Sequence, residues 1–227
     1  MLTPGKAGPG PADPGIVEGM NDEKQSMPSQ LYLTRADQGR ALTLDEFEHA
    51  DAREGYRYEL IDGKLEVAPA PNPSHEDVRA WLIEILIRYK IQHPDVINHI
   101  VVQGRVFIPG RPATTCPEPD VVIYRDYPHH LPRARRRWQD VSPVLVVEVL
   151  SKENPRKDLV RNLELYSLVP SIREYWIVDP LTDADHPSLI VHRRRGQGWQ
   201  KAIVVPAGAT YTTRLMPGLQ LSVDAAN

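Results

Sequence analysis

The segment from residue 144 to residue 178 constrains the fold of this chain more than any other. It begins with residues 144–150, which are apolar except for Glu148, a pattern typical of a central strand covered on both faces. A helical stretch follows over residues 155–168, and a second apolar strand over residues 172–178 completes the unit. A strand, a helix and a strand in this order predict a parallel pair joined by a right-handed crossover, and therefore an α/β fold.

Weaker signals on both sides extend this unit. Residues 58–61 and 64–67 flank Asp62-Gly63, a pair that favours a two-residue hairpin turn with positive φ at both positions. We therefore expect a mixed central sheet flanked by helices, with an N-terminal hairpin. The other expected elements are a short helix over residues 44–52 capped by Thr43, a helix capped by Ser74 that ends before Pro94, one or two strands over residues 96–108, and short strands over residues 121–124, 189–191, 199–205 and 219–223.

Composition indicates one domain with a tail. The 227 residues suit a single domain, and 41% hydrophobic residues are enough for a core. Residues 1–30 are rich in proline and glycine and nearly devoid of apolar side chains, so we predict a disordered tail there and one domain over residues 40–227.

Several classes of protein are disfavoured by the sequence. No apolar run approaches the roughly 20 residues that span a bilayer, and no secretory signal precedes the domain. Cys116 is the single cysteine, which excludes an internal disulfide and a cysteine zinc site. We therefore expect a cytoplasmic protein without a membrane partner.

Glu148 is a charged residue in a strand that is otherwise apolar. Strand alternation places it on the same face as Val146 and Leu150. A carboxylate there is unfavourable by something on the order of several kcal/mol unless a partner compensates its charge. A divalent metal ion is one such partner and an arginine or lysine is another, so both interpretations stay open.

Asp120 stands at the start of the preceding strand, after Pro117-Glu118-Pro119. The two prolines restrict where its carboxylate can point, although an aspartate at such a position can also be a simple turn residue. Two acidic residues near the ends of successive strands can share one hard cation, and Mg²⁺ prefers oxygen ligands of this kind. Asp120 and Glu148 together therefore predict a Mg²⁺ site, in which Mn²⁺ could substitute.

Five segments, in order along the chain, carry a resemblance to a known family. They are residues 58–63, 73–75, 119–122, 146–151 and 174–180. Together they resemble the Uma-two family of restriction-endonuclease-like proteins, a branch of the PD-(D/E)xK nuclease superfamily. The resemblance implies a restriction-endonuclease-like fold and Mg²⁺-dependent hydrolysis of DNA phosphodiester bonds by an endonuclease.

The same resemblance implies roles for individual residues. Asp120 and Glu148 would be metal ligands, and Glu59 would be the additional acidic ligand from the hairpin, unless it is only a cross-strand partner there. His75 lies one helical turn before Val78 on the apolar face of its helix. We expect it to face the carboxylates, or else to bond to the backbone at the start of the helix.

The chain departs from the family pattern at a lysine. The resemblance implies a lysine just before the Leu-x-x-Tyr element of residues 163–166, and Asn162 stands there instead. Asn162 is expected to face the site, where its amide can orient a water molecule but brings no positive charge. Lys157 and Arg161 are better placed than Lys152 to substitute for that charge, unless they are solvated surface cations.

The net charge of −3 and pI of about 6.2 limit how such a protein could meet DNA. Dedicated nucleic-acid binders are often strongly basic, so we expect contact within a local cleft. The runs at residues 133–137 and 193–195 either bind phosphates or are solvated loop charge.

Cutting both strands of DNA would favour a homodimer. The alternatives are a catalytically inactive module that binds nucleic acid or a protein partner, and a structural protein in which Glu148 is ion-paired.

Overall fold

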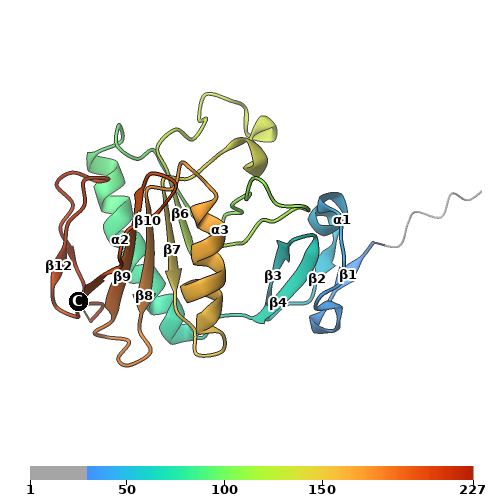
Figure 1. The fold of residues 1–227 in the computed structure, drawn as a ribbon, viewed down its shortest axis with the longest axis horizontal. Helices are drawn as coiled ribbons and strands as arrows, with labels where there is room; N and C mark the ends of the chain where they lie inside the picture. The colour runs from blue at the N-terminus through green and yellow to red at the C-terminus, as the bar shows by residue number, and fades with distance from the viewer. Residues whose placement is uncertain (1–29, 227) are drawn as a thin grey trace, which may run out of the picture. The chain divides into compact units, whose positions relative to one another are not determined.

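The computed structural model describes residues 30–226 (Figure 1). The tail predicted over residues 1–30 lies outside this range except for Gln30, and the domain limits predicted at residues 40–227 stay a prediction. The described part has the predicted mixed α/β architecture, a central and mostly antiparallel sheet with helices packed against it.

The central sheet has the strand order β10-β9-β8-β7-β6-β5, and β11 also pairs with β9. Strands β7 and β8 are parallel, with Val146 opposite Tyr175, so the predicted crossover unit is confirmed. All other neighbours in this sheet are antiparallel. The strands are β5 (His99–Val102), β6 (Val121–Tyr124), β7 (Leu145–Val149), β8 (Glu174–Asp179), β9 (Ser188–Arg195), β10 (Gly198–Trp199) and β11 (Ile203–Val205).

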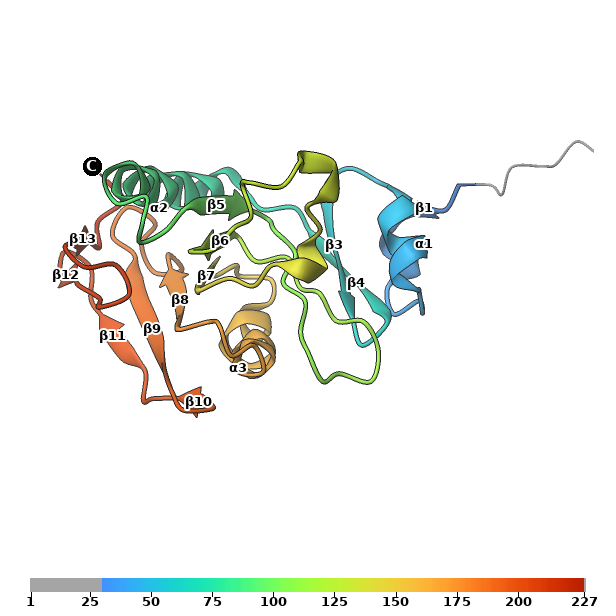
Figure 2. The ribbon, with the colours of Figure 1, turned by 90° about the horizontal axis from the view of Figure 1, so that it is seen from above.

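Helices cover opposite faces of this sheet, as Figure 2 shows from above. Helix α2 (Pro73–Gln92) packs on the face that carries Val147 and Val149. The other face, which carries Val146 and Leu150, packs against the crossover helix, which ends in α3 (Leu163–Ser167). Both faces of β7 are thus buried, as its apolar sequence predicts.

The N-terminal hairpin is formed by β3 (Tyr56–Ile61) and β4 (Lys64–Pro69). Its turn residues Asp62 and Gly63 have φ of 51° and 71°, which confirms the turn inferred from the Asp-Gly pair. A main-chain hydrogen bond of 2.7 Å from Cys116 N to Leu60 O ties the hairpin to the segment that leads into β6. The remaining elements are β1 (Tyr32–Leu33), η1 (Arg35–Asp37), α1 (Leu44–His49), β2 (Asp51–Ala52), η2 (Arg133–Arg135), η3 (Trp138–Asp140), β12 (Thr210–Tyr211) and β13 (Leu221–Ser222).

Several local expectations differ from the structure, among them the limits of the helix expected over residues 44–52, which ends at His49, and of the strand expected over residues 199–205, which is two strands. The cap of α2 is Asn72 and not Ser74: its side chain accepts from His75 N at 2.9 Å, and Pro73 occupies the first helical position, which proline favours. Only residues 99–102 of the segment 96–108 form a strand. The crossover helix is not regular, because η4 (Lys157–Asn162) is a π-helical turn that precedes α3. Within the described range, no helix is both long and apolar enough to cross a membrane.

Candidate functional site

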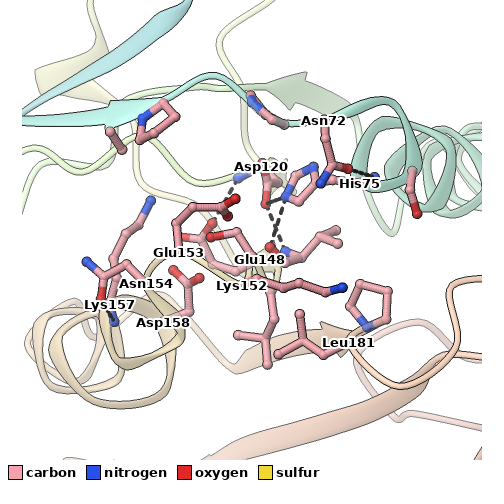
Figure 3. Close-up of a pocket in the computed structure, with 18 of the residues that line it drawn as sticks. Asn72, His75, Asp120, Glu148, Lys152, Glu153, Asn154, Lys157, Asp158 and Leu181 are labelled. Atoms are coloured by element: carbon pink, nitrogen blue, oxygen red, sulfur yellow. Dashed lines mark hydrogen bonds and ion pairs between the residues drawn. The ribbon is translucent and has the colours of Figure 1, made fainter.

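A cleft of about 520 Å³ opens beside the end of β7 (Figure 3). The start of α2, the end of β4 and the loop before η4 also contribute to its walls. Its polar lining includes Arg57, His75, Asp120, Glu148, Lys157 and Asp158.

The pairing of β6 with β7 brings the two predicted carboxylates together. Val121 lies opposite Val147 in an antiparallel register, so the next positions along the two strands are Asp120 and Glu148. The main-chain amide of Asp120 donates to Glu148 Oε2 at 3.3 Å, and the amide of Val149 donates to Asp120 Oδ2 at 2.8 Å. Both residues are only 1% exposed. Two carboxylates are therefore held rigidly by the sheet itself.

Glu148 is held by hydrogen bonds and not by an ion pair. Its Oε1 accepts from Asn162 Nδ2 at 2.8 Å and from the hydroxyl of Tyr166 at 3.2 Å. No lysine or arginine in the described part of the chain forms an ion pair with it, so the structure does not support the ion-pair interpretation of this residue. Burial, and next the charge of Asp158, raise the pKa of Glu148 well above its usual value.

Asp120, in contrast, has a cationic partner. Arg57 Nη1 donates to Asp120 Oδ1 at 2.7 Å, and His75 Nε2 lies 3.3 Å from Oδ2. Burial alone would raise the pKa of Asp120, but the hydrogen bond from His75 and the guanidinium of Arg57 outweigh it and hold the pKa below its usual range. Asp120 is therefore an anion at neutral pH.

His75 faces Asp120, as one of its two interpretations predicts, and its ring bonds to the backbone of β7 and not to the start of its own helix. Its Nε2 lies 2.9 Å from Val149 O and 3.3 Å from Asp120 Oδ2, and because both atoms are acceptors, Nε2 carries the proton. Nδ1 is buried and has no hydrogen-bond partner among residues 30–226. His75 thus joins the carboxylate of Asp120 to the backbone at the end of β7.

Asn162 faces the site, as predicted, and connects two carboxylates. Its Nδ2 donates to Glu148 Oε1 and, at 3.1 Å, to Asp158 Oδ1, while its Oδ1 accepts from Arg161 Nε at 3.0 Å. Asp158 is itself buried, and burial raises its pKa to about 7.

Glu59 lies beside cations rather than beside the other two predicted ligands. Its Oε1 is 3.2 Å from Lys157 Nζ, and its Oε2 accepts from Arg161 Nη2 at 2.5 Å. Burial would raise the pKa of Glu59, but the charges of Lys157 and Arg161 outweigh it and lower the pKa to about 2. The cleft lining includes Asp120 and Glu148 but not Glu59, so its role as a metal ligand stays a prediction.

The donor chemistry of the cleft fits a hard divalent cation. No group of three or more His, Cys, Asp or Glu side chains in the described region is arranged to hold a metal. Mg²⁺ does not require such a group, because it is often bound by one or two carboxylates completed by waters and substrate phosphates. Burial disfavours the charged forms of Glu148 and Asp158 and raises the pKa of both, and a bound cation would favour the ionised carboxylates.

Comparisons with known proteins identify the family and the fold of this chain. The model of the Uma2 family, described as "Putative restriction endonuclease", matches residues 44–224. The chain belongs to the Uma2 family. A crystal structure described as a putative nuclease belonging to DUF820 from Anabaena variabilis ATCC 29413 is 20% identical, with a TM-score of 0.59 over 82% of this chain and 97% of that chain. At that identity the likeness shows a shared fold. No curated protein matches the chain.

Sequence analysis missed two members of the site in this Uma2 protein. Arg57 alternates with Glu59 along β3, so strand alternation places both on the face opposite to Tyr58 and could have indicated it. Asp158 also lines the cleft, and its place four residues before Asn162, on one helix face, could have indicated it.

The two basic runs make several internal contacts. Arg194 donates to the main-chain carbonyls of Tyr166, Val169 and Ile172 at 2.9, 2.9 and 2.5 Å, which caps the end of α3. Arg136 donates to carbonyls of its own loop. The guanidinium groups of Arg194 and Arg136 therefore stabilise the fold of this Uma2 protein. Phosphate binding by the other arginines of the two runs stays a prediction.

Proposed function

We propose that this protein is a Mg²⁺-dependent endonuclease that hydrolyses DNA phosphodiester bonds, with Mn²⁺ able to replace Mg²⁺. The observation that carries the proposal is the pair Asp120 and Glu148, two buried carboxylates joined through a main-chain amide at a cleft. Membership of the Uma2 family supports nuclease chemistry at this cleft.

Asp120 and Glu148 are the side chains that would hold the metal ion. When bound, a divalent ion would offset the negative charge of the phosphodiester and lower the pKa of a water molecule. The protein's own groups keep the ligands in place. Arg57 and His75 fix the two oxygens of Asp120, and the buried amide of Asn162 fixes Glu148.

DNA is the proposed substrate because cations also line the cleft of an otherwise acidic chain. Arg57, Lys152 and Lys157 all contribute to the lining. With a net charge of −3, the chain as a whole repels a polyanion, so binding would be confined to this local region. Such binding should weaken as salt rises, because phosphate contacts release counterions.

A plasmid-cleavage assay tests the proposal. Supercoiled DNA is incubated with the protein and Mg²⁺, Mn²⁺ or EDTA, and we expect nicked or linear product only with a metal ion. Asp120→Asn and Glu148→Gln should abolish cleavage without loss of fold, which circular dichroism checks. Glu153→Gln is the matched control, since Glu153 lines the same cleft but is exposed. Cleavage that survives EDTA or either ligand variant would contradict the proposal.

A second function is favoured by one observation. Asn162 brings no positive charge, and the guanidinium of Arg57 already occupies Asp120 Oδ1. Such a site would suit a catalytically inactive module that binds nucleic acid or a protein partner. That module would bind DNA equally in EDTA and would show no cleavage with any metal, so the same assay with an added binding measurement separates the two.

A homodimer belongs to the nuclease proposal. Two sites related by two-fold symmetry could act on the two antiparallel strands of one duplex. Sedimentation equilibrium at the concentrations used for cleavage would determine the assembly state. A monomer that still linearises plasmid in one binding event would contradict the proposed homodimer.

A further inference from the structure

We propose that Lys157 supplies the positive charge at the scissile phosphate, and that the π-helical turn η4 brings it to the cleft. This inference rests on the proposed nuclease function and deepens it. Hydrolysis of a phosphodiester builds negative charge on the phosphoryl oxygens, and a fixed cation near them is one of the strongest ways to stabilise it.

Three side chains of arginine or lysine among the described residues line the cleft, and they are not equivalent. The guanidinium of Arg57 is bound to Asp120 Oδ1 at 2.7 Å. Lys152 is exposed in the loop after β7 and makes no ion pair within residues 30–226. Lys157 lies between these extremes: its side chain is 16% exposed, and its Nζ lies 3.2 Å from Glu59 Oε1. Lys157 is therefore held in place yet still borders the space where a substrate would bind.

The carboxylates around Lys157 keep it charged. Burial would lower its pKa, but Glu59, Glu148 and Asp158 outweigh burial and raise the pKa above its ordinary value. Figure 3 shows Lys157 and Asp158 on the same helical segment, beside Glu148.

The π-helical turn brings Lys157 and Asn162 closer to one face than a regular α-helix would. In an α-helix, residues five apart are separated by about 140° around the axis. A π-helix closes its hydrogen bonds from i to i+5, so residues five apart lie nearer to one face than they do in an α-helix. Lys157 and Asn162 are the first and last residues of η4, and Asn162 contacts Glu148 directly. The extra residue in the turn thus directs Lys157 to the side that carries Asn162.

Arg161, the other substitute considered from the sequence, has a different place. Its Nε donates to Asn162 Oδ1 and its Nη2 to Glu59 Oε2. It lines a second, smaller hollow with Asp62 and Glu164 and not the cleft of Asp120. Arg161 therefore helps to hold Glu59, which in turn holds Lys157, and it acts as a positioning residue.

Cleavage kinetics on the full chain test this inference. With Mg²⁺ and a labelled duplex under single-turnover conditions, Lys157→Gln should lower the rate about 100-fold or more, an effect typical of removing one preorganised group at a transition state. Lys157→Arg should keep most of the activity. Lys201→Gln, the control at an exposed lysine outside the cleft lining, should stay within about 3-fold of the wild type. An Lys157→Gln rate within the same 3-fold range would overturn the inference.

A rescue variant separates a charge role from a structural one. Asn162→Lys placed in the Lys157→Gln background returns a cation beside Glu148 without restoring the Glu59 contact, and we expect at least a 10-fold recovery. A loss that neither this variant nor Lys157→Arg restores would mean that Lys157 is only structural, and would overturn the inference.

Binding provides a readout that does not depend on catalysis. The affinity for a duplex in EDTA, measured by fluorescence anisotropy at several salt concentrations, should show a salt slope lower by about 1 for Lys157→Gln, as for loss of one phosphate contact. An unchanged slope would overturn the inference. Wild-type protein that never cleaves would instead refute the proposed nuclease function, and the two failures are therefore distinct.

Discussion

Replacing Glu59 with glutamine would test how the buried charges beside the cleft are balanced. The carboxylate is 6% exposed and lies between Lys157 and Arg161. Glutamine keeps the shape of the side chain but removes its charge. Two partly buried cations would then lack their anionic partner, a situation that strongly destabilises folded proteins.

The size of the effect follows from the pKa of the carboxyl. Its ordinary value is 4.5, and the two cations outweigh burial and lower it to about 2 in the folded protein. Each pH unit between folded and unfolded pKa values corresponds to about 1.4 kcal/mol, so Glu59 stabilises the fold by about 3 kcal/mol at neutral pH.

The lowered pKa of Glu59 determines how its contribution to stability changes with pH. Because the folded pKa is lowered, the stabilisation is complete above pH 4.5 and is lost as the pH falls through about 2. Urea denaturation followed by circular dichroism should show Glu59→Gln less stable than the wild type by about 3 kcal/mol at pH 7 and by about 1.4 kcal/mol at pH 3. Glu153→Gln, at an exposed position, should stay within about 0.5 kcal/mol of the wild type at both values.

Two results would refute this reasoning. Equal stability of wild type and Glu59→Gln at pH 7 would show that the ion pairs contribute nothing. A difference that is as large at pH 3 as at pH 7 would show that the glutamine acts through packing and not through charge.

Three further predictions concern other parts of the fold. Tyr166→Phe removes a hydrogen bond to Glu148 Oε1 and should lower the free energy of unfolding by about 1–2 kcal/mol in urea titrations; unchanged stability would argue against that bond. Arg194→Met removes the donor that binds several carbonyls at the end of α3 and should cost about 2 kcal/mol or more, whereas Arg195→Met should be nearly neutral. The thiol of Cys116 is buried, and burial raises its pKa to about 12, so Ellman's reagent at pH 8 should label it only after unfolding, and rapid labelling of the native protein would contradict this.

Local signals made much of the fold predictable. The hairpin turn follows from Asp62-Gly63, because few residue pairs adopt positive φ twice in succession. The parallel pair follows from two apolar runs separated by a helix. The π-helical turn had no such signal in the sequence, because it is accompanied by tertiary contacts such as that between Asn162 and Glu148.

The candidate site, like the fold, could be predicted from the sequence only in part. Asp120 and Glu148 could be paired from the sequence because they stand at the ends of neighbouring strands. Strand alternation gives the face on which Arg57 lies, but its contact with Asp120 joins positions 63 residues apart and depends on how the hairpin packs. Lys157 and Arg161 were candidates from the sequence, but their pairing with Glu59 could not be predicted for the same reason, and it changes what that carboxylate is expected to do.

Calorimetric titration of Mn²⁺ into the purified protein tests the central claim most directly. We predict that the wild type binds Mn²⁺ and that Asp120→Asn and Glu148→Gln each weaken the affinity. Loss of a residue that only supports a metal ligand typically weakens affinity by about 10- to 100-fold, and we expect a larger loss here. Glu153→Gln should bind as the wild type does. Equal Mn²⁺ affinity in all four proteins, or no binding by the wild type, would contradict a metal site at these two carboxylates.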